Sequence, residues 1–230
     1  DFVAMNYYDG QGFMVKKDLG VSSAKELDGA TVCIQTGTTT ELNLADFFKS
    51  NGISYTPVTV GDDAEAQRQY LAGACDTFTT DASGLASNRA AMPDPENHII
   101  LPEIISKEPL GPVVRHGDNN WGDIVRWTYY ALVAAEEKGI TKANLEEVAA
   151  KAATDPNADP EVKRLLGIGD DDLGAMMGLD KEWAKRAIAA SGNYGEIFEA
   201  NIGTATPIGL ARGLNAQWTQ GGLQYAPPFR

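Results

Sequence analysis

The first part of the chain alternates between short apolar runs rich in β-branched residues and stretches with helical spacing. Strand-like residues at 5–16, interrupted by a turn at Asp9-Gly10, precede a regular pattern. The expected strands are 31–35, 54–60, 75–80 and 98–101, and the expected helices are 39–50, 64–71 and 83–91. Strands that alternate with helices imply right-handed crossovers between parallel strands. The sequence therefore predicts an α/β domain built on a parallel sheet.

The pattern changes at residues 108–112, EPLGP, whose two prolines and lack of a Ser/Gly run are typical of a hinge. One more strand is expected at 113–115, and the remainder reads as helical. The expected helices are 121–138, 145–153, 160–166, 181–190 and 194–200. This part has too few strands for a sheet of its own. We therefore expect that its partner layer is missing and that the first section of the protein has been removed.

The segment Thr31–Glu41, TVCIQTGTTTE, is a candidate anion site. It reads as a strand, a turn and a helix start in which Thr38 is the N-cap and Glu41 completes a capping box. The backbone N–H groups of Thr38, Thr39 and Thr40 then lie at the carboxyl end of a parallel strand, where open α/β sheets bind anionic groups. A well-capped crossover helix without a ligand produces the same sequence pattern.

Asp81 directly follows another predicted strand, at the end of CDTFTTD, and belongs to the same sheet edge. If the two strands are neighbours, a positive helix terminus and a carboxylate lie close together there. Such a pair is complementary to a zwitterion, with its carboxylate on the N–H groups and its ammonium on Asp81. The alternative role of Asp81 is the N-cap of the helix that begins near Ser83.

The bulk composition restricts the possible partners. A net charge of -13 and a pI near 4.5 disfavour nucleic acid and anionic membranes, which are themselves polyanions. No apolar run approaches the roughly 18 residues that a membrane span requires. The opening DFVAMNYYDGQG has neither the basic nor the apolar region of a signal peptide, so we expect a cytosolic, processed or truncated chain.

Two cysteines, Cys33 and Cys75, fall in predicted neighbouring strands. They can form a disulfide, which requires an oxidising compartment, or remain two buried thiols. Together with two histidines they give no zinc spacing, and we expect neither a metal site nor a cofactor. The chain contains no G-x-S-x-G, GxxxxGK[ST] or GxGxxG motif, so no residue is assigned a catalytic role.

Four segments carry a resemblance to a known family: GATVCIQTGTTTELNLADFF, GACDTFTTDASGL, LPEIISKEPLGPVVRHGD and GLNAQWTQGGLQYAPPFR. In this order they resemble the general L-amino-acid-binding proteins of bacterial polar-amino-acid ABC importers, which have the periplasmic binding protein type 2 fold. The resemblance extends over essentially the whole chain. IISKEPLGPVVR and WTQGGLQYAPP are its most specific parts, since the GTTTE turn is widespread in that fold.

The resemblance implies an α/β fold with one complete Rossmann-like lobe and a partial, mostly helical first lobe. Residues 21–108 correspond to the complete second lobe. Residues 1–20 and 109–230 correspond to the hinge strands and the remainder of the first lobe. By the same resemblance, Thr38–Thr40 contact the ligand carboxylate and Asp81 holds the ammonium. The implied periplasmic location favours a disulfide between Cys33 and Cys75.

One departure from the family affects function. The family's arginine that clamps the ligand carboxylate lies in a section that no residue here matches. We therefore expect a solute-binding protein for L-amino acids that serves an ABC permease in the inner membrane, truncated and weakened in binding. Exposed apolar surface would favour dimerisation or segment exchange. The rival interpretations are a dehydratase-like periplasmic enzyme, with Asp81 as the visible acid or base, and a ligand-sensing domain.

Overall fold

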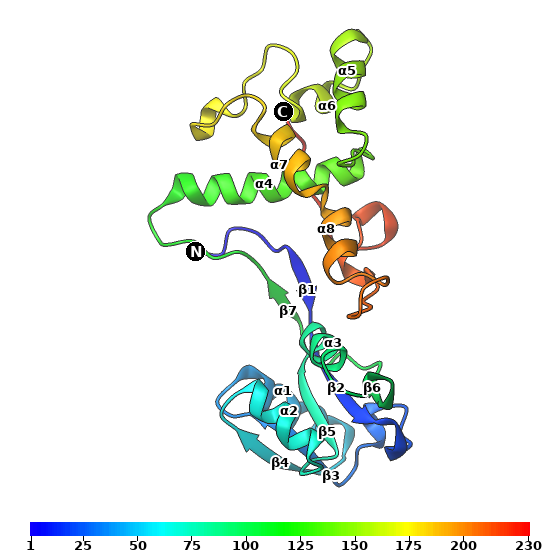
Figure 1. Cartoon of the computed structure of the whole chain (residues 1–230). Helices are drawn as coiled ribbons and strands as arrows, with labels where there is room; N and C mark the ends of the chain where they lie inside the picture. Colours follow the sequence, from blue (N-terminus) through cyan, green and yellow to red (C-terminus); the bar gives the residue numbers. More distant parts are fainter. The chain divides into compact units, whose positions relative to one another are not determined.

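The computed structural model describes residues 1–230, and the chain forms two compact units (Figure 1). Unit 2 is Asp9–Pro109, and unit 1 combines Asp1–Tyr8 with Leu110–Arg230. The division near residue 109 is close to the boundary expected at 108/109. The other division differs from the boundary expected at 20/21, because residues 11–16 form a strand inside the sheet of unit 2. None of the helices combines the length and the apolar character that a bilayer crossing requires.

Unit 2 is built on a five-stranded sheet in the order β4-β3-β5-β2-β6. The strands are β2 (Gln11–Lys16), β3 (Ala30–Gln35), β4 (Tyr55–Val60), β5 (Thr77–Asp81) and β6 (His98–Ile100). β3 is parallel to β4 and β5, as the crossover pattern predicts. β2 is antiparallel to both β5 and β6, so β6 runs in the same direction as β3, β4 and β5. The sheet is therefore mixed, and its antiparallel strand, β2, lies outside the range 21–108 for which a parallel sheet is expected. β2 precedes the strand–helix–strand units in the chain, so the crossover rule, which applies to parallel strands, does not constrain its direction.

The helices of unit 2 are α1 (Thr39–Asn51), α2 (Asp63–Leu71) and α3 (Ala82–Ala90), close to the predicted ranges. Alternation along the strands gives the sheet two apolar faces. On one face Phe13 and Ile34 pack with Leu44 and Phe48 of α1. A second cluster holds the intervening strand residues together with side chains of the other two helices; its members include Met14, Cys33, Phe78, Ala66, Tyr70 and Leu85. The site-bearing helix α1 is therefore fixed on its own face of the sheet.

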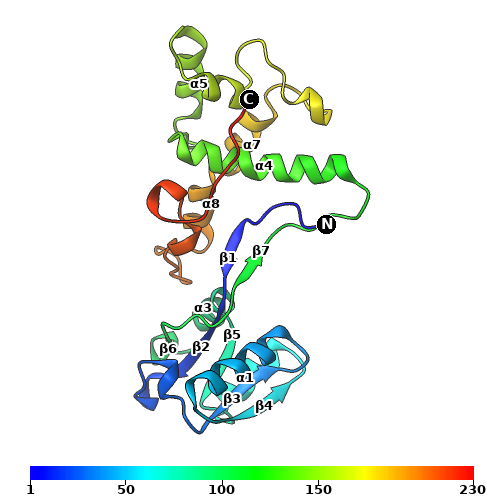
Figure 2. The same cartoon turned by 180° about the vertical axis from the view of Figure 1, so that it is seen from behind.

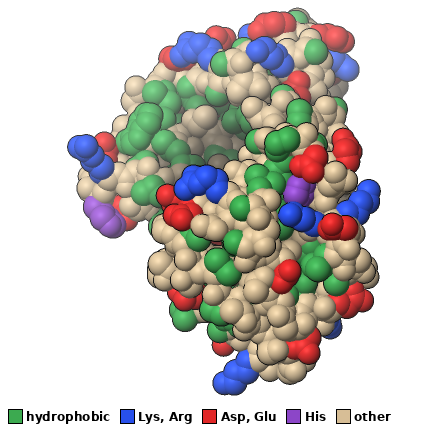
Figure 3. Space-filling view, turned by 60° about the horizontal axis from the view of Figure 1, so that its bottom comes forward, with side chains coloured by type: hydrophobic (Ala, Val, Ile, Leu, Met, Phe, Trp, Pro, Cys, Tyr) green, Lys and Arg blue, Asp and Glu red, His purple; other side chains and the backbone are tan.

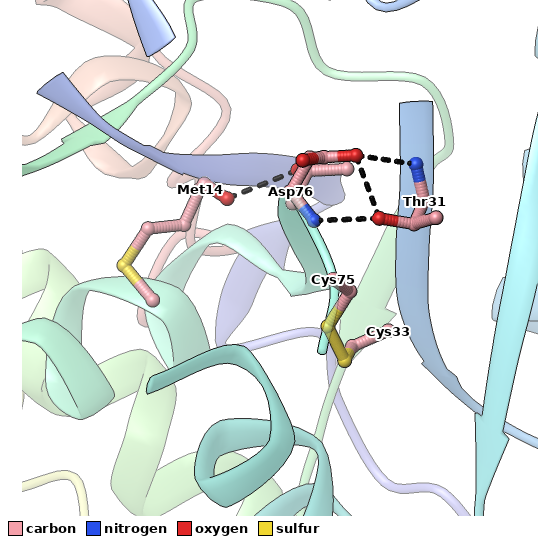
Figure 4. The surroundings of a disulfide bond; sticks show 6 residues. Met14, Thr31, Cys33, Cys75 and Asp76 are labelled. Atoms are coloured by element: carbon pink, nitrogen blue, oxygen red, sulfur yellow. Dashed lines mark hydrogen bonds between the residues drawn. A yellow bond between two sulfur atoms is a disulfide. The ribbon is translucent and has the colours of Figure 1, made fainter. Parts of the chain in front are cut away.

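Cys33 of β3 and Cys75, just before β5, form a disulfide, and neither remains as a free thiol (Figure 4). Their Cα atoms are 5.6 Å apart. Next to the bridge, the carboxylate of Asp76 accepts hydrogen bonds from the backbone N–H and the hydroxyl of Thr31, at 2.8 and 2.6 Å. Both bonds lower the pKa of Asp76, and the bond from the hydroxyl has the larger effect. The neighbouring strands β3 and β5 are thus joined covalently and by hydrogen bonds near the beginning of β5.

Unit 1 is mainly helical, with α4 (Asn119–Glu137), α5 (Leu145–Thr154), α6 (Pro160–Leu165), α7 (Trp183–Ser191) and α8 (Tyr194–Asn201). Its apolar core contains Ala131, Leu145, Leu165, Ile188 and Phe229. The two short strands β1 (Tyr7–Asp9) and β7 (Glu108–Leu110) pair side by side, and in each of them the chain crosses from one unit to the other (Figures 1 and 2).

Two local predictions around these strands are wrong. Residues 5–16 do not fold back on themselves at Asp9-Gly10, because β1 pairs with β7 while β2 joins the sheet of unit 2. The strand expected at 113–115 is reduced to one isolated bridge between Val113 and Phe2. β7 lies instead in the segment read as a hinge, and its partner comes from the beginning of the chain. Pairing between such distant segments leaves no local sequence signal.

The C-terminal tail of unit 1 is held by buried amides. The side chain of Asn215 accepts from the N–H of Tyr8 at 2.7 Å and donates to its carbonyl at 3.0 Å. Fully buried Gln224 donates to the carbonyl of Asn6 at 3.2 Å and to the hydroxyl of Tyr194 at 3.0 Å. Because each amide satisfies main-chain groups beside β1, the tail and the first residues of the chain form one structure.

We predict that the disulfide stabilises unit 2 through its unfolded state. Replacing Cys33 and Cys75 together by alanine should lower the free energy of unfolding by roughly 4 kcal/mol in the chain-entropy model. Urea unfolding of both proteins, with and without dithiothreitol, measures this. The reductant should lower the midpoint of the natural chain and leave that of the double variant unchanged. An equal response of the two proteins would contradict the prediction.

Candidate functional site

The helix α1 begins at the predicted place, but its first turn is not capped as the sequence suggests. Thr38 occupies the N-cap position with extended backbone, φ -108° and ψ 162°, yet its side chain makes no capping hydrogen bond. Its hydroxyl donates to the carbonyl of Gln35 at 2.9 Å, and Glu41 accepts from the N–H of Gly37 at 3.0 Å. The capping box predicted for Thr38 and Glu41 is therefore wrong. The first N–H groups of a helix have no acceptor within it, so those of α1 are left without a side-chain acceptor.

Asp81 lies at the same edge of the sheet as this turn. β3 and β5 are adjacent and parallel, with Val32 opposite Thr77 and Cys33 opposite Phe78, so both strands end at one edge, called the site edge below. Asp81 is the last residue of β5 and the N-cap residue of α3, but its carboxylate makes no capping hydrogen bond. The structure thus brings Thr38–Thr40 and Asp81 to one edge, and the capping role considered for Asp81 is not realised.

Asp9 satisfies the beginning of α3 in place of Asp81. One oxygen of Asp9 accepts from the N–H of Ser83 at 3.3 Å, and the other accepts from the Ser83 hydroxyl. Asp9 also accepts from the N–H of Gly10 at 2.9 Å. The carboxylate of Asp9 is therefore engaged within the protein, whereas that of Asp81 is half-buried and accepts no hydrogen bond from the chain.

The surroundings of Asp81 are acidic. Burial raises the pKa of Asp81 to about 6, and the negative charges of Asp9, Glu108 and Asp63 act in the same direction. Asp9 is the last residue of β1, whereas Glu108 and Asp63 are the first residues of β7 and α2. The three elements are far apart in the sequence. Sequence reasoning missed all three, since no local motif connects them. The arrangement favours a ligand that brings a positive charge to Asp81.

Other features of unit 2 are separate from the site edge. A cavity of about 370 Å³ lies at the opposite edge, between Lys16 at the end of β2 and His98 at the start of β6. The His98 ring contacts the hydroxyl of Tyr70 at 2.8 Å and the carboxylate of Asp94 at 3.3 Å. None of the four predicted ligand residues lines this cavity. No group of three or more His, Cys, Asp or Glu is arranged to hold a metal ion.

Comparison with known proteins identifies the class. A solved structure of an ABC transporter periplasmic binding protein from Brucella ovis, with glutathione bound, is 53% identical to this chain. The match covers 100% of this chain and 71% of that chain with a TM-score of 0.92. No family model matches. The chain belongs to the periplasmic binding proteins of ABC transporters.

Two curated relatives are more specific in their names. The glutamate/glutamine/aspartate/asparagine-binding protein BztA of Rhodobacter capsulatus is 74% identical over 230 residues. The general L-amino acid-binding periplasmic protein AapJ of Rhizobium johnstonii is 56% identical over 231 residues. Both matches cover the whole of this chain, which spans 66% of the length of each relative. The predicted family and fold class are confirmed.

We predict that Asp81 titrates near pH 6 in the folded chain, about two units above an ordinary aspartate. A raised pKa means that the folded state binds the proton more tightly than the unfolded state. Unit 2 should therefore lose stability as pH rises from about 4 through 6. Carboxyl-carbon NMR measures the midpoint, which Asp9→Asn should lower.

Urea unfolding at pH 5 and pH 8 checks the stability consequence. Asp81→Asn should reduce the loss of stability between these pH values, whereas Asp46→Asn, on the exposed side of α1, should preserve it. A midpoint near 4 for Asp81, or the same pH dependence in both variants, would contradict the assignment.

Proposed function

We propose that this chain is the amino-acid-capturing part of a periplasmic solute-binding protein that delivers L-amino acids to an ABC permease in the inner membrane. The observation that supports this most is the pairing at the site edge. The first-turn N–H groups of α1 and the carboxylate of Asp81 lie at the same edge, and neither is used by a cap. An α-amino acid presents the matching charges, a carboxylate and an ammonium, on one carbon.

In the proposed complex, the ligand carboxylate accepts hydrogen bonds from the backbone N–H groups of Thr38–Thr40 at the positive end of α1. The interaction of a negative charge with a helix N-terminus contributes about 0.3–1 kcal/mol when exposed and up to about 2 kcal/mol when partly buried. The ammonium pairs with Asp81, whose acidic neighbours Asp9, Asp63 and Glu108 strengthen the attraction for a cation. The same neighbours repel an acidic ligand side chain, which must therefore point away from them.

The names of the relatives are consistent with recognition of this shared group. One is named for binding glutamate, glutamine, aspartate and asparagine, and the solved relative holds glutathione. Glutathione begins with a γ-linked glutamyl residue whose α-amino and α-carboxyl groups are free. We propose that unit 2 recognises this α-amino-acid head, so the rest of the ligand can vary in length.

We further propose that unit 2 corresponds to the second lobe of the family and unit 1 to part of the first. The exposed apolar side chains are unevenly distributed between them. Unit 1 carries ten of these large side chains, and unit 2 carries only Leu19, Leu42, Leu71 and Ile104. The ten are Phe2, Met5, Leu110, Val113, Trp121, Met176, Leu214, Trp218, Leu223 and Tyr225. On the face in Figure 3, several apolar side chains reach the surface among charged ones of both signs.

This distribution supports self-association of the chain alone, and the family resemblance supports weak ligand binding. The match covers 66% of the length of each relative, and the family resemblance places the carboxylate-clamping arginine in the unmatched part. Apolar surface that lacks a covering layer drives association between copies, by dimerisation or by segment exchange.

The binding proposal is tested by calorimetric or NMR titration of the chain with L-glutamine. Asp81→Asn should weaken binding roughly 10-fold or more, since a charge-assisted hydrogen bond contributes about 1.5–3 kcal/mol. Asp46→Asn should bind as the natural chain does. Nα-acetylglutamine, which lacks the ammonium, should lose affinity for the natural chain and be insensitive to Asp81→Asn. Equal binding of glutamine and its acetylated form would contradict the proposal, and micromolar or tighter binding by a monomer would contradict the expected weakening.

The association proposal is tested with two surface variants of unit 1 and one matched control in unit 2. Phe2→Ser and Val113→Ser change exposed side chains of unit 1, and Leu42→Ser changes an equally exposed side chain of unit 2; their exposed fractions are 68%, 64% and 68%. In sedimentation velocity, the two unit 1 variants should shift the chain toward monomer, whereas Leu42→Ser should leave it unchanged. A chain that is monomeric at all concentrations, or that responds equally to Leu42→Ser, would contradict the proposal.

A further inference from the structure

Gln11, the first residue of β2, is a fully buried amide at the site edge. Its Nε2 donates to the carbonyl of Thr40 at 3.1 Å and to the hydroxyl oxygen of Thr79 at 2.9 Å. Its Oε1 is the buried side-chain atom that has no hydrogen-bond partner. An unpaired buried acceptor costs about 1–3 kcal/mol, so an apolar residue of the same size would fit the core better. The amide therefore needs an explanation other than packing.

The orientation of this amide is determined by its partners. The Thr79 hydroxyl donates its proton to the carbonyl of Gly12 at 2.7 Å, so its oxygen can only accept from Gln11. The Thr40 carbonyl is likewise an acceptor. A flipped amide would place Oε1 against two acceptor oxygens. Both donors of Gln11 are thus committed, one to α1 and one to β5.

The strand register places Gln11 beside Asp81. The two residues are directly opposite in the antiparallel pair of β2 and β5. The N–H of Gln11 donates to the Ser106 hydroxyl and its carbonyl accepts from the N–H of Ile105, so neither main-chain group bonds to β5. Such non-hydrogen-bonded pairs approach most closely, with Cα atoms about 4.5 Å apart. Gln11 and Asp81 are therefore neighbours on one face of the sheet.

We propose that Gln11 is a positioning residue that couples the two halves of the candidate site. Its amide holds the first turn of α1, through the Thr40 carbonyl, at a fixed distance from the strand that ends in Asp81. A ligand that spans both halves then finds its N–H donors and its carboxylate already in register. The inference rests on the proposed function for the identity of the ligand, but not for the coupling itself, which exists in the ligand-free chain.

The test uses the full chain with Gln11→Met, which keeps the length of the side chain and removes both donors. Gln35→Met is the matched control, because Gln35 also donates from its side chain to a main-chain carbonyl, that of Gly61 at 3.1 Å. Gln35 is likewise a terminal strand residue at this edge, the last of β3 where Gln11 is the first of β2. In the ligand-free chain, Gln11→Met should shift the amide resonances of Thr39 and Thr40 and the titration midpoint of Asp81, whereas Gln35→Met should leave that midpoint unchanged.

Titration with L-glutamine then measures the coupling. Gln11→Met should weaken binding about tenfold in the natural chain and by less than twofold when combined with Asp81→Asn, because positioning matters only while Asp81 can hold the ammonium. A merely structural role would give the same factor in both backgrounds. Additive losses, or unchanged resonances of the turn and of Asp81, would overturn the inference.

Two further outcomes are distinguishable. If the natural chain binds no amino acid while the ligand-free shifts appear, the proposed function fails and the coupling stands. If Gln11→Met does not fold, Thr79→Val removes the β5 acceptor and leaves Gln11 in place. It should produce the same changes at Thr40 and Asp81 to a smaller extent, and their absence would overturn the inference.

Discussion

The parallel pairing of β3 with β5 is the constraint on which the candidate site depends. Because the two strands run in the same direction as neighbours, the turn after one and the carboxylate that ends the other reach the same edge. The Cys33–Cys75 disulfide and the hydrogen bonds of Asp76 to Thr31 join these strands near the beginning of β5. The pairing is thus reinforced at one end of the sheet, and the polar groups that could bind a ligand gather at the other.

At that edge, the expected side-chain caps of α1 and α3 are not formed. The hydroxyl of Thr38 turns back to Gln35, and Asp9 rather than Asp81 satisfies the beginning of α3. Each missing cap leaves a polar group unused by the fold: the first-turn N–H groups of α1 in one case and a half-buried carboxylate in the other. Departures from the expected caps therefore coincide with the groups that a zwitterion would engage.

Electrostatics explain why the carboxylate at the end of β5 is costly without a ligand. Burial and three neighbouring acids raise the pKa of Asp81. An ammonium group at this position would offset the repulsion that the folded chain otherwise carries. In the proposed complex these charges favour the ammonium at the head of the ligand, and the ligand side chain is left to other groups.

From the sequence one could predict the order of elements in unit 2, the helices of unit 1 to within a few residues, the family, and the placement of Thr38–Thr40 and Asp81 after or at the ends of strands. The elements and their ends follow from periodicity and turn signals, which are local, whereas the family follows from the resemblance of four segments. Four features emerge only in the folded chain: the antiparallel direction of β2, the pairing of β1 with β7, the carboxylates around Asp81 and the buried amide of Gln11. Each of these joins segments far apart in the chain. Their partners are selected by packing and strand register, for which a single sequence carries no local signal.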